Sequence, residues 1–249
     1  MAGFRSYFPN GNLKKGQLVS LSAIESRHLV KALRAKIGDP VTLFDGQGEA
    51  WTATINGVGR EAEVLIGDVL PIEPAGHELI LGLGMLKGKA MDSAIKLAVE
   101  IGATSLFPLA TERTEVRLGA ARAESKHEHW QTVAIEAAKQ SGNLGGLAIH
   151  APQSLASWTA GLDHKPLLIV ASLEEGAQPI LETLAASNGS VCIAVGPEGD
   201  FSPSEYLALD EAGFLPVSFG SNVLRAETAV AYALSVIKAH HSVQASDSK

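Results

Sequence analysis

Two short segments late in the chain combine glycines with charged residues directly after apolar runs. The first, GPEG at 196–199, follows the run SVCIAVG and holds Glu198 between its glycines. The second, GSNVLRAETA at 220–229, places Arg225 and Glu227 at the start of an apolar helix. Glycine lets a backbone approach a ligand closely, and a turn needs no carboxylate between its glycines. Together the two segments predict a pocket for a polar small molecule.

Helix-start chemistry explains part of this pattern without any ligand. Ser202, Pro203 and Glu205 form the sequence of an N-cap, a proline in the first turn and a capping-box glutamate. Glu227 at the start of a helix also complements the helix dipole, so a purely structural role stays open for it. Arg225 is different, because the same dipole disfavours a cation at a helix N-terminus. Its position therefore calls for a functional reason.

The sequence lacks the motifs of several other binding and catalytic sites. The chain contains no GxGxxG, no GxxxxGK[ST] and no GxSxG pattern, so neither a dinucleotide, nor ATP, nor serine hydrolysis is supported. The eight histidines are scattered, and His127 and His129 have the wrong helical spacing for a zinc pair. We therefore expect no metal.

Composition indicates a globular protein with an aliphatic core. Of its 249 residues 46% are hydrophobic and 5% aromatic, and the single cysteine, Cys192, lies in an apolar run. A disulfide within the chain is impossible, and we expect a buried, inert thiol. No apolar run reaches the roughly 18 residues that a membrane span needs, and the N-terminus lacks the apolar core of a signal peptide. We expect a cytoplasmic protein without a membrane partner.

The charge is distributed unevenly. Residues 1–39 carry seven basic and two acidic side chains, whereas residues 161–249 carry four basic and eleven acidic ones. A basic region on an acidic body is typical of an RNA-binding module joined to a catalytic domain. On the helix expected at 22–33, Arg27, Lys31 and Arg34 would share one face. A solvated surface without a partner explains the same charges equally well.

Hydrophobic patterning divides the chain into two parts. Residues 1–73 read as five short strands and one helix, with Ile24, His28, Leu29 and Leu33 among its apolar positions, which indicates a small β-barrel. A linker rich in Pro and Gly follows. Residues 74–243 alternate apolar strands with helices, which predicts an α/β domain with a parallel sheet. Residues 244–249 read as a disordered tail.

The motifs, taken in order, resemble those of a known family. GPEG with FSPSE, followed by LRAETA, closely resembles the ribosomal RNA small-subunit methyltransferase E family of the knotted SPOUT methyltransferases. SRHLVKALRAKIGDPVTLFDGQG at 26–48, the segment 87–113 and WQTVAIEAAKQSG at 130–142 are similar to three further motifs of that family. The resemblance extends over essentially the whole chain.

This resemblance implies a fold and an activity. The fold is a PUA-like RNA-binding β-barrel followed by an α/β SPOUT domain with a C-terminal trefoil knot, in a homodimer. The activity is transfer of a methyl group from S-adenosyl-L-methionine to N3 of a uridine in 16S rRNA, free or in the small ribosomal subunit. Two alternatives stay open: a knotted methyltransferase acting on tRNA or on a ribose 2′-oxygen, and a catalytically silent RNA-binding protein of ribosome assembly.

Site residues follow from the same segments. The resemblance assigns the methyl donor to three strand-end segments, comprising Val170, Ala171, Ser172, Val195, Gly196, Pro197, Glu198, Gly199, Gly220, Asn222, Val223, Leu224, Glu227, Thr228 and Ala229. Because N3 must lose a proton and its charge must be stabilised, we expect Arg225, Glu227 and Glu198 to be catalytic. For RNA binding we expect a basic set comprising Arg5, Arg27, His28, Lys31, Arg34, Lys87, Lys89 and Arg113.

Three positions depart from the family pattern. Asp200 stands where the family usually has a second glycine, Ala226 where it has a threonine, and Asn143 where it has an arginine. Asp200 adds a carboxylate close to the expected donor, and its role does not follow from the sequence.

Overall fold

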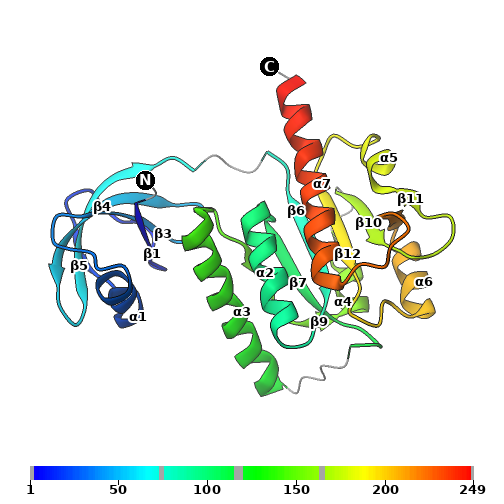
Figure 1. Ribbon diagram of the computed structural model, residues 1–249, viewed down its shortest axis with the longest axis horizontal. Coiled ribbons are helices and arrows are strands. Elements are labelled where there is room, and N and C mark those ends of the chain that lie inside the picture. Colours follow the sequence, from blue (N-terminus) through cyan, green and yellow to red (C-terminus); the bar gives the residue numbers. More distant parts are fainter. Residues whose placement is uncertain (1–2, 73–75, 115–119, 163–165, 248–249) are drawn as a thin grey trace. The chain divides into compact units, whose positions relative to one another are not determined.

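The computed structural model describes residues 3–72, 76–114, 120–162 and 166–247 (Figure 1). The chain forms two compact units. The first comprises residues 1–74 together with 135–146, and the second comprises residues 75–134 and 147–249. The domain boundaries at 73/74 and 243/244 stay predictions, and the sequence does not predict that residues 135–146 belong to the first unit.

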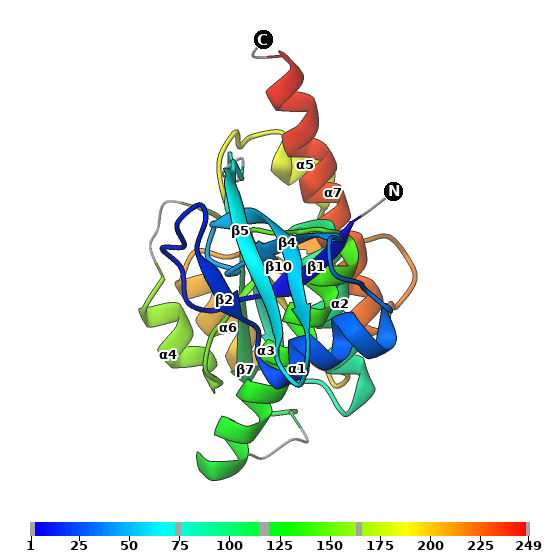
Figure 2. The ribbon, with the colours of Figure 1, turned by 90° about the vertical axis from the view of Figure 1, so that its left-hand side faces the viewer.

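The first unit is built on a five-stranded sheet (Figure 2). Its strands are β1 (Phe4–Tyr7), β2 (Leu18–Ser20), β3 (Pro40–Phe44), β4 (Ala50–Val58) and β5 (Ala62–Leu70), in the order β1-β3-β4-β5-β2. Along β4, buried Trp51, Ala53 and Ile55 alternate with exposed residues, as expected of a strand with one face on a core. All five strands expected from the sequence are present.

The helix of this unit differs from its prediction. It consists of α1 (Ala23–Arg27), which continues as a π-helix from His28 to Ala32. The expected apolar face is confirmed only in part: Leu29 is buried and His28 half-buried, but Ile24 is 73% exposed and Leu33 is 39% exposed, whereas Glu25 is buried. Helical spacing reads Ile24 as the inward residue because the pattern rule assumes that polar residues face solvent.

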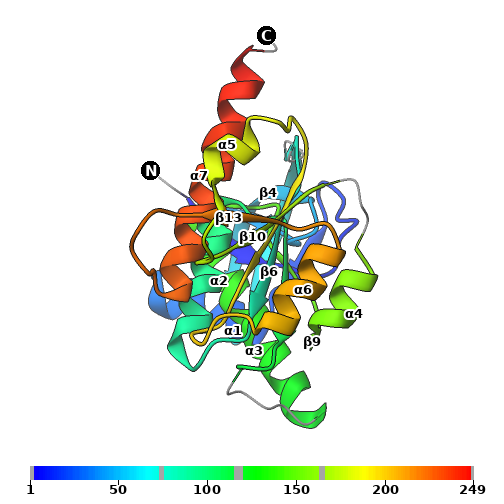
Figure 3. The same cartoon turned by 90° about the vertical axis from the view of Figure 1, so that its right-hand side faces the viewer.

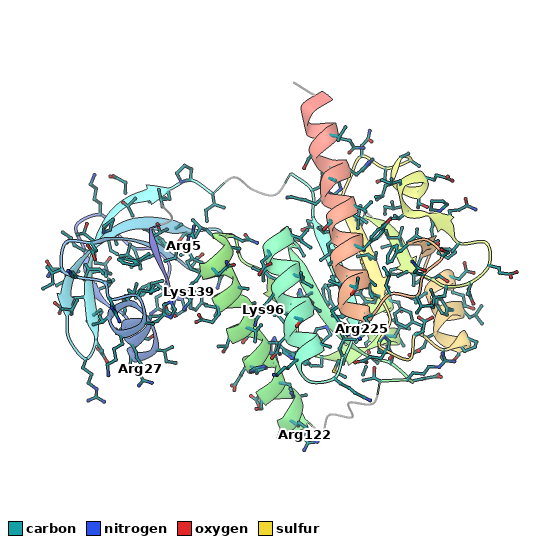
Figure 4. All side chains as sticks on the ribbon, in the orientation of Figure 1. Arg5, Arg27, Lys96, Arg122, Lys139 and Arg225 are labelled. Carbon is teal, nitrogen blue, oxygen red and sulfur yellow. The ribbon has the colours of Figure 1, made fainter. Side chains whose placement is uncertain are left out.

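Glu25 is buried because donors surround its carboxylate. Its Oε2 accepts hydrogen bonds from the Ser6 hydroxyl at 2.6 Å and from the Tyr7 N–H at 3.1 Å. Its Oε1 lies 2.8 Å from Nζ of Lys139, which is itself buried. Arg5 donates to the carbonyl of Lys139 at 2.8 Å, and Figure 4 shows both residues where the end of α3 meets β1. These contacts join residues 135–146 to the first unit.

The second unit is built on an eight-stranded sheet whose strand pairings are all parallel. The strands are β6 (Leu79–Gly84), β7 (Ser105–Ala110), β8 (Ala148–Ile149), β9 (Gln153–Ser154), β10 (Leu167–Ala171), β11 (Gln178–Pro179), β12 (Val191–Val195) and β13 (Leu215–Ser218). Their order is β11-β13-β10-β12-β6-β7-β8, with β9 paired to β7. Because β10, β12 and β13 are parallel neighbours, the loops after their carboxyl ends open on the same edge.

Helices cover both faces of this sheet. The helices after β6 are α2 (Lys89–Ile101), α3 (Ala120–Ser141), whose last residues belong to the first unit, α4 (Leu155–Ala160), α5 (Ile180–Leu184), α6 (Pro203–Glu211) and α7 (Ala226–Asp247). Figures 1 and 3 show α2, α5 and α7 on one face and α4 and α6 on the other. The fold is therefore an α/β domain with a parallel sheet covered on both sides, as predicted.

Differences from the predicted elements of this unit are found in short segments and at helix ends. The sequence does not predict β9, β11 or α4, which have two to six residues. Helix α7 runs to Asp247, so residues 244–247, expected in a disordered tail, are helical. The trefoil knot stays a prediction, because strand order does not by itself describe how the chain is threaded.

The core of the second unit explains the single cysteine. Cys192 lies on β12 and is fully buried, and this burial raises the pKa of its thiol to about 12. A thiol with this pKa stays protonated at neutral pH and is a poor nucleophile. In the described part of the chain no helix is long and apolar enough to cross a membrane. Among the same residues no group of three or more His, Cys, Asp and Glu side chains could hold a metal ion.

Candidate methyl-donor site

A cavity of about 470 Å³ lies in the second unit at the carboxyl ends of β10, β12 and β13. This edge of a parallel sheet is where α/β proteins bind ligands, and the volume suits a small molecule. Its lining comes from the loops after these three strands, from the start of α7 and from α2: Ala90, Ala171, Ser172, Leu173, Val195, Gly196, Pro197, Glu198, Asp200, Phe219, Gly220, Asn222, Val223, Leu224, Arg225, Ala226, Glu227 and Ala229.

The GPEG segment forms a tight turn at the end of β12. The N–H of Asp200 donates to the carbonyl of Pro197 at 2.9 Å, which closes the turn around Glu198 and Gly199. A Cβ atom on Gly196 would lie 2.9 Å from Oδ1 of Asp200 and 3.1 Å from backbone atoms. Gly196 is therefore required for packing of the turn, and its backbone faces the cavity without a side chain.

Two neighbouring loops hold this turn in place. The carboxylate of Glu198 accepts a hydrogen bond from the N–H of Lys87 at 3.1 Å, which ties the turn to the loop after β6. Arg113, in the loop after β7, donates from Nη1 to the carbonyls of Gly199 at 2.9 Å and Phe201 at 3.2 Å. The structure thus gives Glu198 and Arg113 positioning contacts in addition to the catalytic and RNA-binding roles predicted for them.

The second half of the segment begins helix α6. The Ser202 hydroxyl accepts from the N–H of Glu205, and the Glu205 carboxylate accepts from the N–H of Ser202, which completes the capping box that the sequence indicates. Glu205 is buried and also accepts from the N–H of Glu112 at 2.8 Å. FSPSE is therefore structural, and it anchors the turn that precedes it.

The opposite wall of the cavity is the loop between β13 and α7. Gly220 has φ +105°, a conformation that favours glycine. Arg225 stands at the N-cap position of α7, where its carbonyl accepts from the N–H of Ala229 at 2.8 Å (Figure 4). Within the described residues the guanidinium of Arg225 and the carboxylate of Glu227 have no hydrogen-bond partner. Both residues line the cavity, and their polar groups are free to bind a ligand.

Asp200 also lines the cavity, and its backbone has φ +61°. Aspartate tolerates this left-handed conformation better than most residues, since its side chain can bond locally. Oδ1 accepts from the N–H of Phe201 at 2.8 Å, and the hydroxyl of Tyr206 lies 3.0 Å from Oδ1. Burial, and secondarily the charge of Asp200, raises the pKa of Tyr206 far above its usual range, so the phenol stays a proton donor. These contacts give Asp200 a structural role, which the sequence alone does not indicate.

The cavity differs from the predicted donor site at its edges. Val170, Gly199 and Thr228 belong to the predicted set but do not line the cavity, and Val170 is buried in the core. Five residues line it without having been predicted: Ala90, Leu173, Asp200, Phe219 and Ala226. Four of these adjoin predicted residues along the chain, so only Ala90, from α2, lacked a signal in the sequence.

The residues expected to bind RNA are distributed over both units. In the first unit Arg27, Lys31 and Arg34 are exposed, and His28 is half-buried. Arg34 follows the π-helix with φ +55°, so a regular helical face does not relate it to the other two. Arg5 is half-buried and caps the end of α3. In the second unit Lys87 and Lys89 are exposed beside the turn that holds Glu198.

Two family models identify this architecture as that of an RNA methyltransferase with a PUA domain. Residues 73–238 match the family model of the RNA methyltransferase domain, and residues 24–66 match that of the RNA methyltransferase PUA domain. The match covers most of the second unit and much of the first.

Individual relatives and solved structures identify the family within this class of enzymes. The chain is 32% identical over 227 residues to ribosomal RNA small subunit methyltransferase E of Synechocystis sp., covering 89% of this chain and 73% of the relative. The Neisseria gonorrhoeae ribosomal RNA small subunit methyltransferase E, solved with S-adenosyl methionine, is 28% identical with a TM-score of 0.87, over 96% of this chain and 98% of that one. A Legionella pneumophila protein solved with bound SAM is 30% identical with a TM-score of 0.85, over the same shares. The chain belongs to the ribosomal RNA small subunit methyltransferase E family.

Gly84, at the end of β6, allows the turn of Gly196 and Pro197 to pack against the sheet. A Cβ atom there would lie 2.5 Å from Cδ and 2.6 Å from the N atom of Pro197. Because backbone cannot yield as a flexible side chain does, we expect Gly84→Ala to displace the turn. Overpacking of this kind costs about 1–3 kcal/mol, so affinity for S-adenosylmethionine should fall about tenfold in calorimetry. Gly189→Ala is the matched control, since a Cβ atom there meets nothing within 4 Å; equal affinities in the two variants would contradict the expectation.

Proposed function

We propose that this protein transfers a methyl group from S-adenosylmethionine to N3 of a uridine in 16S rRNA. The observation that carries the proposal is the cavity at the strand ends, in which two glycine-containing loops face each other and Arg225 and Glu227 have free polar groups. Family membership supports the reaction, and the similar structures from Neisseria gonorrhoeae and Legionella pneumophila contain the same methyl donor.

The cavity suits S-adenosylmethionine in size, backbone access and charge. Its volume of about 470 Å³ lies within the range of small-molecule sites. Gly196 and Gly220 expose backbone that can hydrogen-bond an adenine, and the apolar side chains of Val195 and Leu224 provide surface for its ring. S-adenosylmethionine supplies a methyl group on a sulfonium, which becomes a neutral thioether when N3 takes the methyl.

Arg225 and Glu227 carry the kinds of group that methylation of uracil N3 requires. Uracil N3 carries a proton, and its removal leaves negative charge on O2 and O4. We assign stabilisation of this charge to the Arg225 guanidinium, because no group among the described residues competes for it. Glu227 is the better candidate than Glu198 to accept the proton, since the carboxylate of Glu198 is already bonded to the N–H of Lys87.

RNA binding is assigned to exposed basic side chains of both units. Arg27, Lys31 and Arg34 lie in the first unit, and Lys87 and Lys89 lie beside the cavity in the second. Contacts with phosphates would hold the RNA, and the target base would have to leave its stack to enter the cavity.

We further propose that the protein acts as a homodimer in the cytoplasm. Support for the dimer comes from apolar side chains near the start of α7: Val223 is 77% exposed and Tyr232 is 41% exposed. The rings of Tyr232 and Phe219 pack with centroids 5.1 Å apart, which gives this surface a fixed aromatic element. Sedimentation equilibrium tests the proposal, and a monomer at micromolar concentration would refute it.

Nucleoside mass spectrometry tests the activity. 16S rRNA from a strain lacking this protein should lack N3-methyluridine, and purified protein with S-adenosylmethionine should restore it. Loss of a ribose methylation, or of a tRNA modification, would instead indicate one of the alternative methyltransferases. An unchanged nucleoside profile together with no binding of S-adenosylmethionine would indicate a silent RNA-binding protein.

Charge reversal tests the role of the first unit. We expect Arg27→Glu combined with Lys31→Glu to weaken RNA binding about tenfold or more and to reduce its salt dependence, because two phosphate contacts would be lost. Binding of S-adenosylmethionine should not change. Lys14→Glu combined with Lys15→Glu changes the net charge equally outside this segment and is the matched control. The assignment fails if fluorescence anisotropy gives both double variants the same RNA affinity.

A further inference from the structure

The lining of the donor cavity contains more acidic than basic residues. Its lining residues include three acidic ones, Glu198, Asp200 and Glu227, and one basic one, Arg225. Such a lining favours a cationic ligand over a neutral one of the same shape. The donor carries a positive sulfonium that its demethylated product, S-adenosylhomocysteine, lacks. The cavity can therefore distinguish the two molecules by charge.

Asp200 is the carboxylate of this set that is held most firmly. Its Oδ1 accepts from the N–H of Phe201 at 2.8 Å, and the Tyr206 hydroxyl lies 3.0 Å from Oδ1 and 3.1 Å from Oδ2. The same hydroxyl lies 3.3 Å from the carbonyl of Ala171, at the end of β10. Tyr206 thus joins Asp200 to the neighbouring strand end, and the carboxylate cannot easily swing out of the lining.

The contacts of Asp200 leave its charge available to a ligand. A carboxylate has about four acceptor positions, and the Phe201 N–H and the single Tyr206 proton occupy two of them. Neither donor is a cation, so neither neutralises the charge. Glu198, by contrast, is exposed, and Glu227 lies on the opposite wall beside Arg225.

We propose that Asp200 is a specificity-determining residue that makes the site prefer the sulfonium donor over its neutral product. The Tyr206 hydroxyl positions the carboxylate, and the charge of Asp200 supplies the preference. The consequence is weaker inhibition by the product, because S-adenosylhomocysteine gains nothing from this carboxylate. This inference rests on the proposed use of S-adenosylmethionine.

Calorimetry with three ligands tests it. S-adenosylmethionine has a sulfonium, sinefungin has an ammonium in its place, and S-adenosylhomocysteine has neither. We expect Asp200→Asn, which keeps the shape and tolerates the positive φ, to weaken binding of the two cationic ligands about five- to tenfold. Binding of S-adenosylhomocysteine should change less than twofold. Asp210→Asn, an exposed position on the same helix as Tyr206, removes equal charge outside the cavity and should change none of the three.

The variant Tyr206→Phe tests the positioning of the Asp200 carboxylate separately from its charge. This variant keeps the charge of Asp200 but removes the hydroxyl that positions it, so the affinity ratio of donor to product should fall, but by less than it falls in Asp200→Asn. The proposal is overturned if Asp200→Asn weakens all three ligands equally, which would mean a structural role or a contact to the α-amino group that all three share. It is also overturned if Tyr206→Phe abolishes the preference as fully as Asp200→Asn does. Failure of the wild-type protein to bind S-adenosylmethionine would instead refute the proposed function, and this inference with it.

Discussion

Replacing Arg225 by alanine should lower the rate of methyl transfer about 10²- to 10³-fold while the affinity for S-adenosylmethionine changes little. The physical reason is that a cation at a helix N-terminus is unfavourable, yet Arg225 stands there with its guanidinium free at the cavity. Such a group is available to stabilise negative charge that appears on the base only as N3 loses its proton. Its loss therefore acts on the transition state rather than on donor binding.

Single-turnover methylation of a 16S rRNA fragment at saturating donor measures this effect. Arg122→Ala, which removes an exposed arginine from α3 in the same unit, is the matched control and should retain the wild-type rate. Arg225→Lys should recover only part of the rate, since an ammonium cannot form the paired hydrogen bonds of a guanidinium. Near-normal methylation by Arg225→Ala would exclude Arg225 from the catalytic step.

Two walls of the cavity could be predicted from the sequence, because the segments GPEG and GSNVLRAETA each follow a buried parallel strand, whereas the third wall was implied by the family resemblance. Apolar runs such as SVCIAVG identify β12, and the order of parallel strands brings their carboxyl ends to one edge. The glycines and the unfavourable position of Arg225 then indicate a ligand site rather than a plain turn. Ala90 could not be found in this way, because it comes from α2 and depends on how that helix packs.

Contacts between distant segments could not be predicted from the sequence. Glu25 is an acidic residue within the helix expected at 22–33, and the helical pattern places such residues toward solvent, but its carboxylate is buried against Lys139, 114 positions along the chain. Asp200 shows the same limit over a shorter separation, since its contact with Tyr206 depends on how α6 follows the turn. In both cases a polar side chain is stable where it lies only because of partners that no local pattern specifies.

The pairing of Glu25 with Lys139 leads to the largest stability effect that we expect. Removal of the carboxylate in Glu25→Ala leaves the Ser6 hydroxyl and the Tyr7 N–H without this acceptor, and among the described residues it leaves the half-exposed Glu136 as the acidic partner of Lys139. Breaking a buried ion pair from one side costs about 3–5 kcal/mol, because the remaining charge loses its compensation. We therefore expect the first unit to lose about 3 kcal/mol or more of its unfolding free energy.

Hydrogen exchange followed by mass spectrometry measures this loss in the intact chain. Amides of β3, β4 and β5 should exchange faster in Glu25→Ala, whereas those of β6 and β12 in the second unit serve as the internal reference. Glu136→Gln removes the exposed partner of the same lysine and should cost less than about 1 kcal/mol, as surface pairs do. Equal destabilisation of the first unit by the two variants would show that burial of Glu25 does not increase the cost of losing its charge. A large effect of Glu25→Ala alone would mean that the end of α3 is held to the first unit by a buried charge.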